Sequence, residues 1–454
     1  MDVVARLRDL VTDPAAVSDD ENVREAHGRD ISPHAPRSPE VVVFPSDTAE
    51  IQAVLRFAGE HGLAVVPFGL GTSVEGQVIP VEGGISLDLS RMREILDVRP
   101  DDFLARVQAG VTRVQLNELL AADGVFFPVD PGVDASIGGM VGTNASGTNA
   151  VRYGVMRDNV LGVEAVLADG TILRTGGMAV KSSAGYDLTR LFVGSEGTLG
   201  VISEVTLRIH RLPQFVMAAR AVFPALHAAA RTATRLIQSG MAIARVELLD
   251  EVTIAAVNAY SRTTYPARPT LFLEFSGTEV SVRHDVATAE RIAAADGADS
   301  LEAEEDEEAR ERLWDARHHA ALAIMATAPE KKLMSTDVCV PVSALADAVA
   351  QARGVVEAEG VTCAILGHVG DGNYHTVFMV DPNDEAEVAR AARINAEIVR
   401  FALSRHGTCT GEHGIGLGKR AYLREERGAA VDVMLAIKHA LDPQGTLNPG
   451  KVLA

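Results

Sequence analysis

The sequence predicts an α+β protein with two domains, and three observations support this prediction. The chain has 454 residues, too many for one compact core of ordinary size. From Glu40 to about His210, short apolar runs alternate with helical patterns and glycine-rich loops. From about Leu212 to Arg400, glycine becomes rarer and Ala-rich amphipathic helices separate apolar runs, which is typical of a separate α+β domain with an antiparallel sheet.

The expected elements follow from these patterns in chain order. A helix is predicted over Thr48–His61, because Asp47 and Thr48 form a start signal before an apolar-periodic stretch. The strands expected in the first region are Val41–Phe44, Ala64–Pro67, Ile85–Asp88, Phe103–Gln108, Leu161–Leu167 and Val201–Ile209. In the second region we expect helices over Ala225–Gly240, Glu279–Ala295 and Val342–Gly360, and strands over Thr270–Phe275, Cys363–Leu366 and Thr376–Val380.

Composition narrows the class of function. Asp and Glu outnumber Lys and Arg by 62 to 42, giving a formal net charge of −20, and such a surface repels nucleic acid and anionic membrane leaflets. The three cysteines are widely spaced without a C-x-x-C pair, which favours a reducing compartment over a disulfide framework. Because no apolar run has signal-peptide or membrane-spanning length, we expect a cytoplasmic protein without a transmembrane segment. Because of the negative net charge, we also expect no nucleic-acid partner.

Three glycine-rich segments lie in the first region. Pro67–Ser73 offers bare amides and two hydroxyls, as an anion-binding nest does, although alone it is equally well a plain glycine turn. Val74 occupies the third glycine position of a Rossmann fingerprint, and no Walker A lysine follows, so both motifs are excluded. Pro131–Gly147 is too polar and glycine-rich to pack a core, and Ser195–Ile202 is a third such turn. Three turns in one region fit a large dinucleotide better than a single phosphate.

Histidines and a carboxylate stand in two glycine-flanked segments near the C-terminus. His368 and His375 lie seven residues apart around Gly370 and Gly372, and Glu412 and His413 are adjacent. Adjacent residues on an extended chain point in opposite directions, so Glu412 and His413 need not share a role. Two histidines and a carboxylate suit a divalent metal with open positions for substrate. A metal-dependent hydrolase or lyase therefore stays an alternative at this point.

The three glycine-rich segments resemble the FAD-binding domain of the vanillyl-alcohol-oxidase (PCMH-type) flavoprotein superfamily. The resemblance implies that the first two segments hold the pyrophosphate of FAD and that the third lines its adenine side. Neither of the first two segments contains a His or Cys for covalent attachment, so FAD is expected to be non-covalent. The residues assigned to FAD are Pro67, Gly69, Gly71, Thr72, Ser73, Pro131, Gly132, Ser136, Gly138, Gly139, Gly142, Ser146, Gly147, Gly197, Ile202 and Asn448.

The His/Glu segments, with Ser335–Pro341 and Asn448–Lys451, resemble the FAD-linked oxidase C-terminal domain. That domain occurs in cytochrome-type D-lactate dehydrogenases, glycolate oxidase flavoprotein subunits and D-2-hydroxyglutarate dehydrogenases. The resemblance is closest to the first of these, through Trp314–His318 and Ser335–Pro341. It implies an FAD-binding domain over 1–212, a substrate-capping domain over 213–403, and a segment over 404–454 that returns to the FAD-binding domain and completes the active site.

The same resemblance assigns roles to five residues. His368, His375 and Glu412 would bind a divalent metal, either Zn or Mn, His413 would be the base that contacts the substrate hydroxyl, and Arg317 would bind the substrate carboxylate. The hydroxyglutarate enzymes carry a lysine just before the Asp of the Ser335–Pro341 stretch. Here Ser335 and Thr336 stand before Asp337, which argues against a dicarboxylate substrate.

The implied function is FAD-dependent oxidation of a D-2-hydroxy acid, with D-lactate to pyruvate as the best match. The metal would assist proton abstraction, and hydride would pass to flavin N5. Reduced FAD then needs an electron acceptor, such as a cytochrome, a quinone, an electron-transfer flavoprotein or an iron–sulfur subunit. A glycolate oxidase flavoprotein subunit of a larger complex, at the membrane through its partner, stays an alternative. The sequence also leaves a homodimer open.

Overall fold

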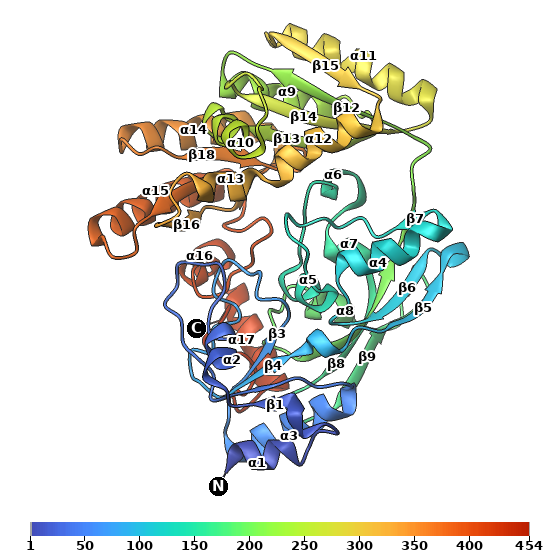
Figure 1. Cartoon of the computed structure of the whole chain (residues 1–454), viewed down its shortest axis with the longest axis vertical. Helices are drawn as coiled ribbons and strands as arrows, with labels where there is room; N and C mark the ends of the chain where they lie inside the picture. Colours follow the sequence, from blue (N-terminus) through green and yellow to red (C-terminus); the bar gives the residue numbers. More distant parts are fainter. Residues whose placement is uncertain (1, 454) are drawn as a thin grey trace. The chain divides into compact units, whose positions relative to one another are not determined.

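A computed structural model describes residues 2–453 (Figure 1). Its internal contacts divide the chain into two compact units. Unit 1 consists of the residues up to Ser146, of Gly154–Leu212 and of the residues from Glu412 onward, and unit 2 consists of Gly147–Tyr153 and Pro213–Gly411. The chain therefore contributes to each unit from separate segments, including a stretch of seven residues that unit 2 takes from the glycine-rich first region.

Unit 1 contains two main sheets. In the four-stranded sheet, with the order β1-β2-β4-β3, strands β2, β4 and β3 are parallel. The five-stranded sheet has the order β5-β6-β10-β8-β9 and is antiparallel throughout. The strands are β1 (Val17–Ser18), β2 (Val41–Val43), β3 (Val65–Phe68), β4 (Ile85–Asp88), β5 (Ile95–Arg99), β6 (Leu104–Gln108), β8 (Val160–Val166), β9 (Ile172–Gly176) and β10 (Val201–Arg208), with β7 (Val125–Phe126) paired to β11 (His210–Arg211).

Helix α3 (Thr48–His61) shows how local sequence forms these elements. The side chain of Asp47 accepts a hydrogen bond from the amide of Glu50 at the start of the helix, and Gly62 ends it in the left-handed conformation. Ile51 and Leu55 on its inner face are fully buried, and each contributes about 1.5–3 kcal/mol of transfer free energy. The other helices of unit 1 are α1 (Val3–Arg8), α2 (Glu21–Ala26), α4 (Arg113–Leu120), α5 (Ile137–Thr143), α7 (Met156–Asn159), α8 (Leu188–Phe192), α16 (Arg420–Arg427) and α17 (Ala430–Leu441).

The core of unit 2 is a large antiparallel sheet with the order β15-β12-β14-β13-β18-β19-β16, and β17 also pairs with β19. Its strands are β12 (Phe215–Val222), β13 (Ile243–Leu249), β14 (Thr270–Gly277), β15 (Ser300–Glu304), β16 (Lys332–Ser335), β17 (Val338–Cys339), β18 (Ala364–Gly367) and β19 (Asn373–Val380). The predicted α+β fold class, with an antiparallel sheet in the second region, is confirmed.

Helices cover this sheet in two groups. Helices α10 (Glu251–Ser261), α12 (Glu307–His318) and α13 (Ala320–Ala326) share a buried apolar cluster with Phe272, Leu366 and Val377 of the sheet. Helix α9 (Leu226–Gln238) packs against both α11 (Glu279–Ala295) and α14 (Leu345–Ala358), and α15 (Glu385–Ser404) packs on α14. The short helix α6 (Ala150–Tyr153) packs on β13.

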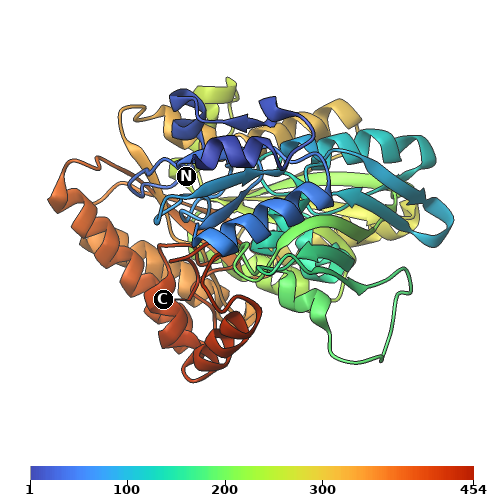
Figure 2. The same ribbon diagram turned by 90° about the horizontal axis from the view of Figure 1, so that it is seen from below.

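Two surface features complete the description. The loop between β9 and α8 projects from unit 1 (Figure 2), and the side chain of Tyr186 in it is 95% exposed. Within residues 2–453, none of the helices is both long enough and apolar enough to cross a membrane.

Candidate active site

The first two glycine-rich segments meet in unit 1. The loop after β3 approaches the start of α5 so closely that a Cβ added to Gly69 would lie 2.5 Å from Oγ of Ser136. Ser136 is the N-cap of α5 and accepts a hydrogen bond from the amide of Gly139 at 3.4 Å. Gly71 has a positive φ of 67°, which a side chain would strain. These glycines therefore let two loop backbones lie together with their polar groups close to each other.

The third segment joins the same place. Glu196 and Gly197 both have positive φ, and a Cβ on Gly197 would lie 2.9 Å from Cγ of Pro67. The amide of Glu196 donates to the carbonyl of Gly142 at 2.8 Å. In contrast, a Cβ added to Gly132 would meet nothing within 4 Å, and one added to Gly142 would meet only Cα of Glu196 at 4.0 Å. The backbone is open at these two positions, and this open glycine surface fits the close approach of a dinucleotide pyrophosphate.

Asn448 connects the C-terminal segment to the cradle, which consists of the three glycine-rich segments Pro67–Ser73, Pro131–Gly147 and Ser195–Ile202. Its side-chain Nδ2 donates to the carbonyls of Glu196 and Gln77, at 2.8 and 3.1 Å, and its amide donates to the carbonyl of Val65 in β3 at 2.8 Å. Among the other residues assigned to FAD, the hydroxyl of Ser73 donates to Asp30, and Ile202 is a buried member of β10. The predicted FAD residues of unit 1 therefore come from loops that contact one another, and the FAD-contacting role of each stays a proposal.

A buried carboxylate that sequence analysis missed holds the backbone next to His413. Oε1 of Glu196 accepts from the amide of Ile415 at 2.7 Å, and Oε2 accepts from the amide of Gly416 at 2.9 Å. Nε2 of Gln77 donates to the carbonyl of His413 at 2.7 Å. Burial raises the pKa of Glu196 to about 7, although the two amide hydrogen bonds act against this rise. Glu196 lies inside the glycine-rich Ser195–Ile202 segment, and this context was the one feature of the sequence that could have marked Glu196 as a site residue.

A second buried carboxylate, Glu247 of β13, joins two predicted site residues in unit 2. Its Oε2 accepts from Nε of Arg317 at 2.8 Å and lies 2.6 Å from Nη2, and its Oε1 lies 2.8 Å from Nδ1 of His368. Burial acts to raise the pKa of Glu247, but the charges and hydrogen bonds of His368 and Arg317 outweigh burial and hold the pKa below its usual value. No pattern in the sequence marked Glu247.

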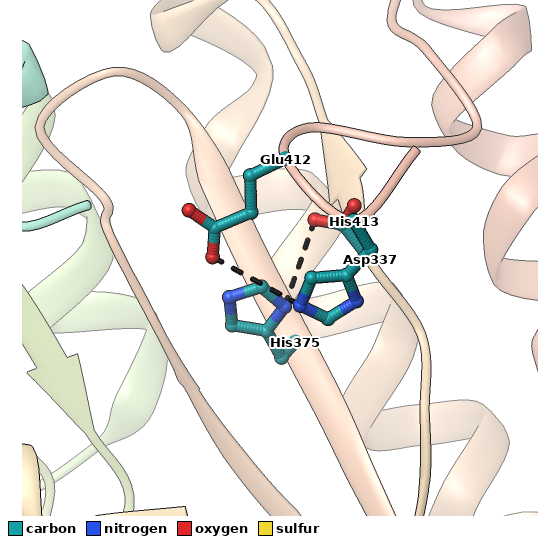
Figure 3. Close-up of side chains that lie close together, drawn as sticks. All are labelled: Asp337, His375, Glu412 and His413. Carbon is teal, nitrogen blue, oxygen red and sulfur yellow. Dashed lines mark ion pairs between the residues drawn. The ribbon is translucent and has the colours of Figure 1, made fainter. Parts of the chain in front are cut away.

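The remaining predicted metal ligands lie in a compact group (Figure 3). Asp337, His375, Glu412 and His413 each offer a ligand atom, and these atoms all lie within 4.8 Å of one another. Glu412 and His413 directly follow Gly411, the last residue of unit 2. Asp337 holds the two residues that precede Glu412. Its Oδ2 accepts a hydrogen bond from Oγ1 of Thr410 at 2.8 Å, and its carbonyl accepts one from the amide of Gly411 at 3.2 Å.

This group does not coincide with the predicted ligand set, and it also contains His413, which was predicted as the base. Asp337 is in it and His368 is not, although the rings of His368 and His375 lie with their centroids 5.9 Å apart. Asp337 is fully buried, and its Oδ1 accepts from Nδ2 of Asn373 at 2.8 Å. Asp337 stands in the Ser335–Pro341 segment that carries the family resemblance, but the sequence analysis gave Asp337 itself no role. The donors are histidine nitrogens and carboxylate oxygens, the set that Zn and Mn take, so the residues present fit a divalent metal.

The cradle and the His/Glu group together define a class, the FAD-binding oxidoreductases. Residues 39–176 match the FAD binding domain model, and residues 212–452 match the model of the FAD linked oxidases, C-terminal domain. The chain belongs to the family of FAD-linked oxidases. It is therefore an enzyme that uses FAD in oxidation and reduction.

Several known proteins are similar over almost the whole chain. The probable mitochondrial D-lactate dehydrogenase of Danio rerio is 48% identical over 98% of this chain and 90% of its own length. Glycolate oxidase subunit GlcD of Bacillus subtilis is 35% identical over 98% of this chain and 95% of its own length. The solved structure of p-cresol methylhydroxylase, 18% identical, superposes with a TM-score of 0.82 over 99% of this chain and 96% of that one, which shows a shared fold.

Proposed function

We propose that this protein oxidises a D-2-hydroxy acid, D-lactate foremost, to the 2-keto acid with non-covalent FAD. The observation that carries the proposal is the shared partner Glu247, which holds the guanidinium of Arg317 beside His368. A 2-hydroxy acid needs such a pair of neighbouring sites, one for its carboxylate and one for its hydroxyl. The relatives from Danio rerio and Arabidopsis thaliana, 48% and 42% identical, are named D-lactate dehydrogenases and support this substrate.

Arg317 is proposed to bind the substrate carboxylate. A guanidinium has five N–H donors in a planar fork, and it pairs with a carboxylate through two parallel hydrogen bonds. Nε and Nη2 face Glu247, which leaves the edge that carries Nη1 for the substrate. The side chain is only 10% exposed, so its pairing with a substrate is little weakened by water.

His368, His375 and Glu412 are proposed to hold a divalent metal, Zn or Mn, with Asp337 beside them. The compact donor group supports His375 and Glu412 as ligands, and the ring of His368 lies next to that of His375. Asp337 has two further hydrogen bonds that hold it in place. A bound metal would supply Lewis acidity toward the substrate hydroxyl. His413 is proposed to take the hydroxyl proton as a general base, a role that histidine commonly fills near neutral pH. The backbone of His413 is held for this by Gln77.

The glycine-rich loops would hold FAD, which would supply hydride-accepting redox chemistry when bound, and the electrons would then need a further acceptor. We propose a cytochrome, a quinone, an electron-transfer flavoprotein or an iron–sulfur subunit as that acceptor. We also propose a cytoplasmic location, consistent with three cysteines that form no disulfide in the described chain. The family favours oxidation over the hydrolase or lyase alternative. The glycolate oxidase subunits among the relatives keep glycolate as the second candidate substrate.

The test is an anaerobic visible spectrum of the purified protein before and after separate additions of D-lactate, L-lactate and glycolate. We expect flavin absorbance that bleaches with D-lactate and not with L-lactate. Bleaching with glycolate, and weakly or not at all with D-lactate, would assign the glycolate oxidase role instead. A protein whose bound flavin is reduced by none of the three would contradict the proposal.

A further inference from the structure

The side chain of Glu247 is fully buried and connects two groups with different proposed tasks. Arg317 has the substrate carboxylate as its proposed partner, and His368 has the metal. Both bind the same carboxylate within 3.0 Å. A lone buried carboxylate would be costly, so this arrangement is stable only while both partners stay in place. The position of each partner is therefore tied to that of the other.

The three side chains are built on rigid elements. Glu247 lies near the end of β13, and antiparallel pairing places its neighbour Leu248 opposite Gly367, the residue before His368. Arg317 stands in the last turn of α12, one turn after Trp314. The guanidinium of Arg245, two residues before Glu247 on the same strand, lies 4.7 Å from the centre of the Trp314 ring. Strand register and helix packing thus fix how far apart the three groups lie.

The hydrogen bond to Glu247 determines which nitrogen of His368 can face a metal. A carboxylate can only accept hydrogen bonds, so Nδ1 of His368 must carry the hydrogen that it shares with Oε1 and Oε2. When the ring is neutral, as a metal ligand must be, the second nitrogen, Nε2, keeps its lone pair for a metal. The same carboxylate engages the Nε edge of Arg317, so one group sets both the ligand atom of His368 and the direction of the arginine fork.

Resting on the proposed function, we propose that Glu247 is a positioning residue that sets the spacing and angle between the carboxylate-binding Arg317 and the metal-binding His368. A fixed spacing selects acids whose hydroxyl is on the carbon next to the carboxylate. Glu247 thereby makes the enzyme selective for 2-hydroxy acids over 3-hydroxy acids, without touching either kind of substrate.

The first test is Glu247→Gln in the flavin-loaded protein. The amide oxygen of glutamine can accept from Arg317, but its NH2 group donates to Nδ1 of His368, which moves the histidine hydrogen to Nε2 and removes the ligand lone pair. We expect the affinity for Zn²⁺ and Mn²⁺, titrated without substrate, to fall about 10- to 100-fold. The KM for D-lactate should rise at least tenfold, while the inhibition constant of D-3-hydroxybutyrate changes less than twofold. Flavin content should stay that of the wild type.

The matched control is Glu274→Gln on the neighbouring strand β14. Glu274 is a half-buried carboxylate that pairs with Arg245 at 3.5 Å rather than with Arg317 or His368. We expect its metal affinity and KM to stay within twofold of the wild type. A folded Glu247→Gln protein with wild-type metal affinity and wild-type KM would overturn the proposal. Glu247→Asp, which keeps the charge and the accepting oxygens, should recover part of the lost metal affinity, and no recovery would count against it.

A second variant keeps the test decisive if Glu247→Gln fails to fold. Arg317→Lys leaves all the proposed metal ligands intact but removes the planar partner that holds Glu247. Because the carboxylate is shared, we expect the metal affinity without substrate to fall at least about threefold, the scale of coupling between contacting residues. A smaller change would overturn the shared-partner role. These metal titrations involve no hydroxy acid, so a wild-type flavin that no 2-hydroxy acid reduces would refute the proposed function separately.

Discussion

The carboxylate of Glu196 accepts a hydrogen bond from the backbone amide of Ile415 at 2.7 Å. A residue of the third glycine-rich segment thus holds the backbone two residues after His413. The same carboxylate accepts a hydrogen bond from the amide of Gly416, which lies 220 positions after Glu196 in the chain. Glu196 is buried beside Glu75, whose charge adds to the effect of burial, and the pKa of Glu196 rises to about 7. The segment that bears the proposed base is therefore held by a group that titrates near neutral pH.

Glu196 should make the stability of the protein depend on pH. Its pKa in the folded protein lies above the ordinary value of 4.5, so its contribution to stability is fully present below pH 4.5 and is lost as the pH rises to about 7. We expect the free energy of unfolding of the wild type, relative to Glu196→Gln, to fall by on the order of 3 kcal/mol over this range. Denaturant unfolding of both proteins at several pH values measures it.

Glu50→Gln is the control for this pH dependence. Glu50 accepts from the amides of Thr12 and Ser46, and these bonds outweigh burial and lower the pKa of Glu50. Its contribution to stability should therefore be lost as the pH falls below its ordinary range, the opposite direction. Equal pH slopes for the wild type and Glu196→Gln would refute the prediction for Glu196.

Gly142→Ala should separate flavin binding from folding. Gly142 lies in α5, and an added methyl would meet no protein atom nearer than 4.0 Å, so the apoprotein should be as stable as the wild type or more stable by about 0.5–1 kcal/mol. If FAD approaches this open backbone, the methyl should weaken flavin binding at least tenfold. Flavin fluorescence titration of the apoprotein measures the affinity, and thermal unfolding measures the stability.

The matched control for Gly142 is Gly354→Ala. Gly354 lies in helix α14 of unit 2, where an added methyl also meets nothing within 4 Å. The Gly354→Ala variant should gain a similar free energy of unfolding with no change in flavin affinity. Equal flavin affinity in the two variants would remove Gly142 from the cofactor cradle.

His413→Asn should abolish the proposed proton transfer while leaving flavin binding intact. General-base catalysis contributes about 10²- to 10⁴-fold to rates, and the rate of flavin reduction by D-lactate should fall by that factor. Stopped-flow spectroscopy under anaerobic conditions measures the rate, and flavin content is measured on the same sample. His439→Asn, an exposed position on α17, is the control and should react as the wild type does. A His413→Asn rate within twofold of the wild type would exclude His413 as the base.

Asp337→Asn should loosen the group in Figure 3. The two carboxylate oxygens of Asp337 accept from Asn373 and Thr410, and an asparagine would turn an NH2 group toward one of these donors. We expect the free energy of unfolding to fall by about 1–3 kcal/mol, the cost of a buried unsatisfied donor. Metal affinity should fall as well, measured by metal titration.

Asp381→Asn serves as the comparison for Asp337. Its oxygen accepts from the exposed Asn383, and water can replace that bond, so its cost should stay within about 0.5 kcal/mol. If the two variants lose equal stability and metal affinity, Asp337 has no special place in the group.

Local patterns in the sequence were sufficient for much of the fold. The helix over Thr48–His61 lies where its start signal and apolar period predict it, because capping and periodicity are local properties. The antiparallel sheet of unit 2 and the FAD-linked oxidase family followed from apolar runs and glycine and histidine motifs. Strands β12 and β13, of which β13 carries Arg245 and Glu247, were not predicted, since their mixed residues do not form a distinct apolar run.

The sequence by itself determined which residue types could do the chemistry: glycines that open a backbone, and histidines and a carboxylate that suit a metal. Only the tertiary structure decided which buried carboxylates support them. Glu247 is 121 positions from His368 and reaches it through the register of β13 on β18, while Asp337 reaches Thr410 across 73 positions. Strand register depends on packing of the whole sheet, and no local pattern encodes it, so these partners could be found only after the chain had folded.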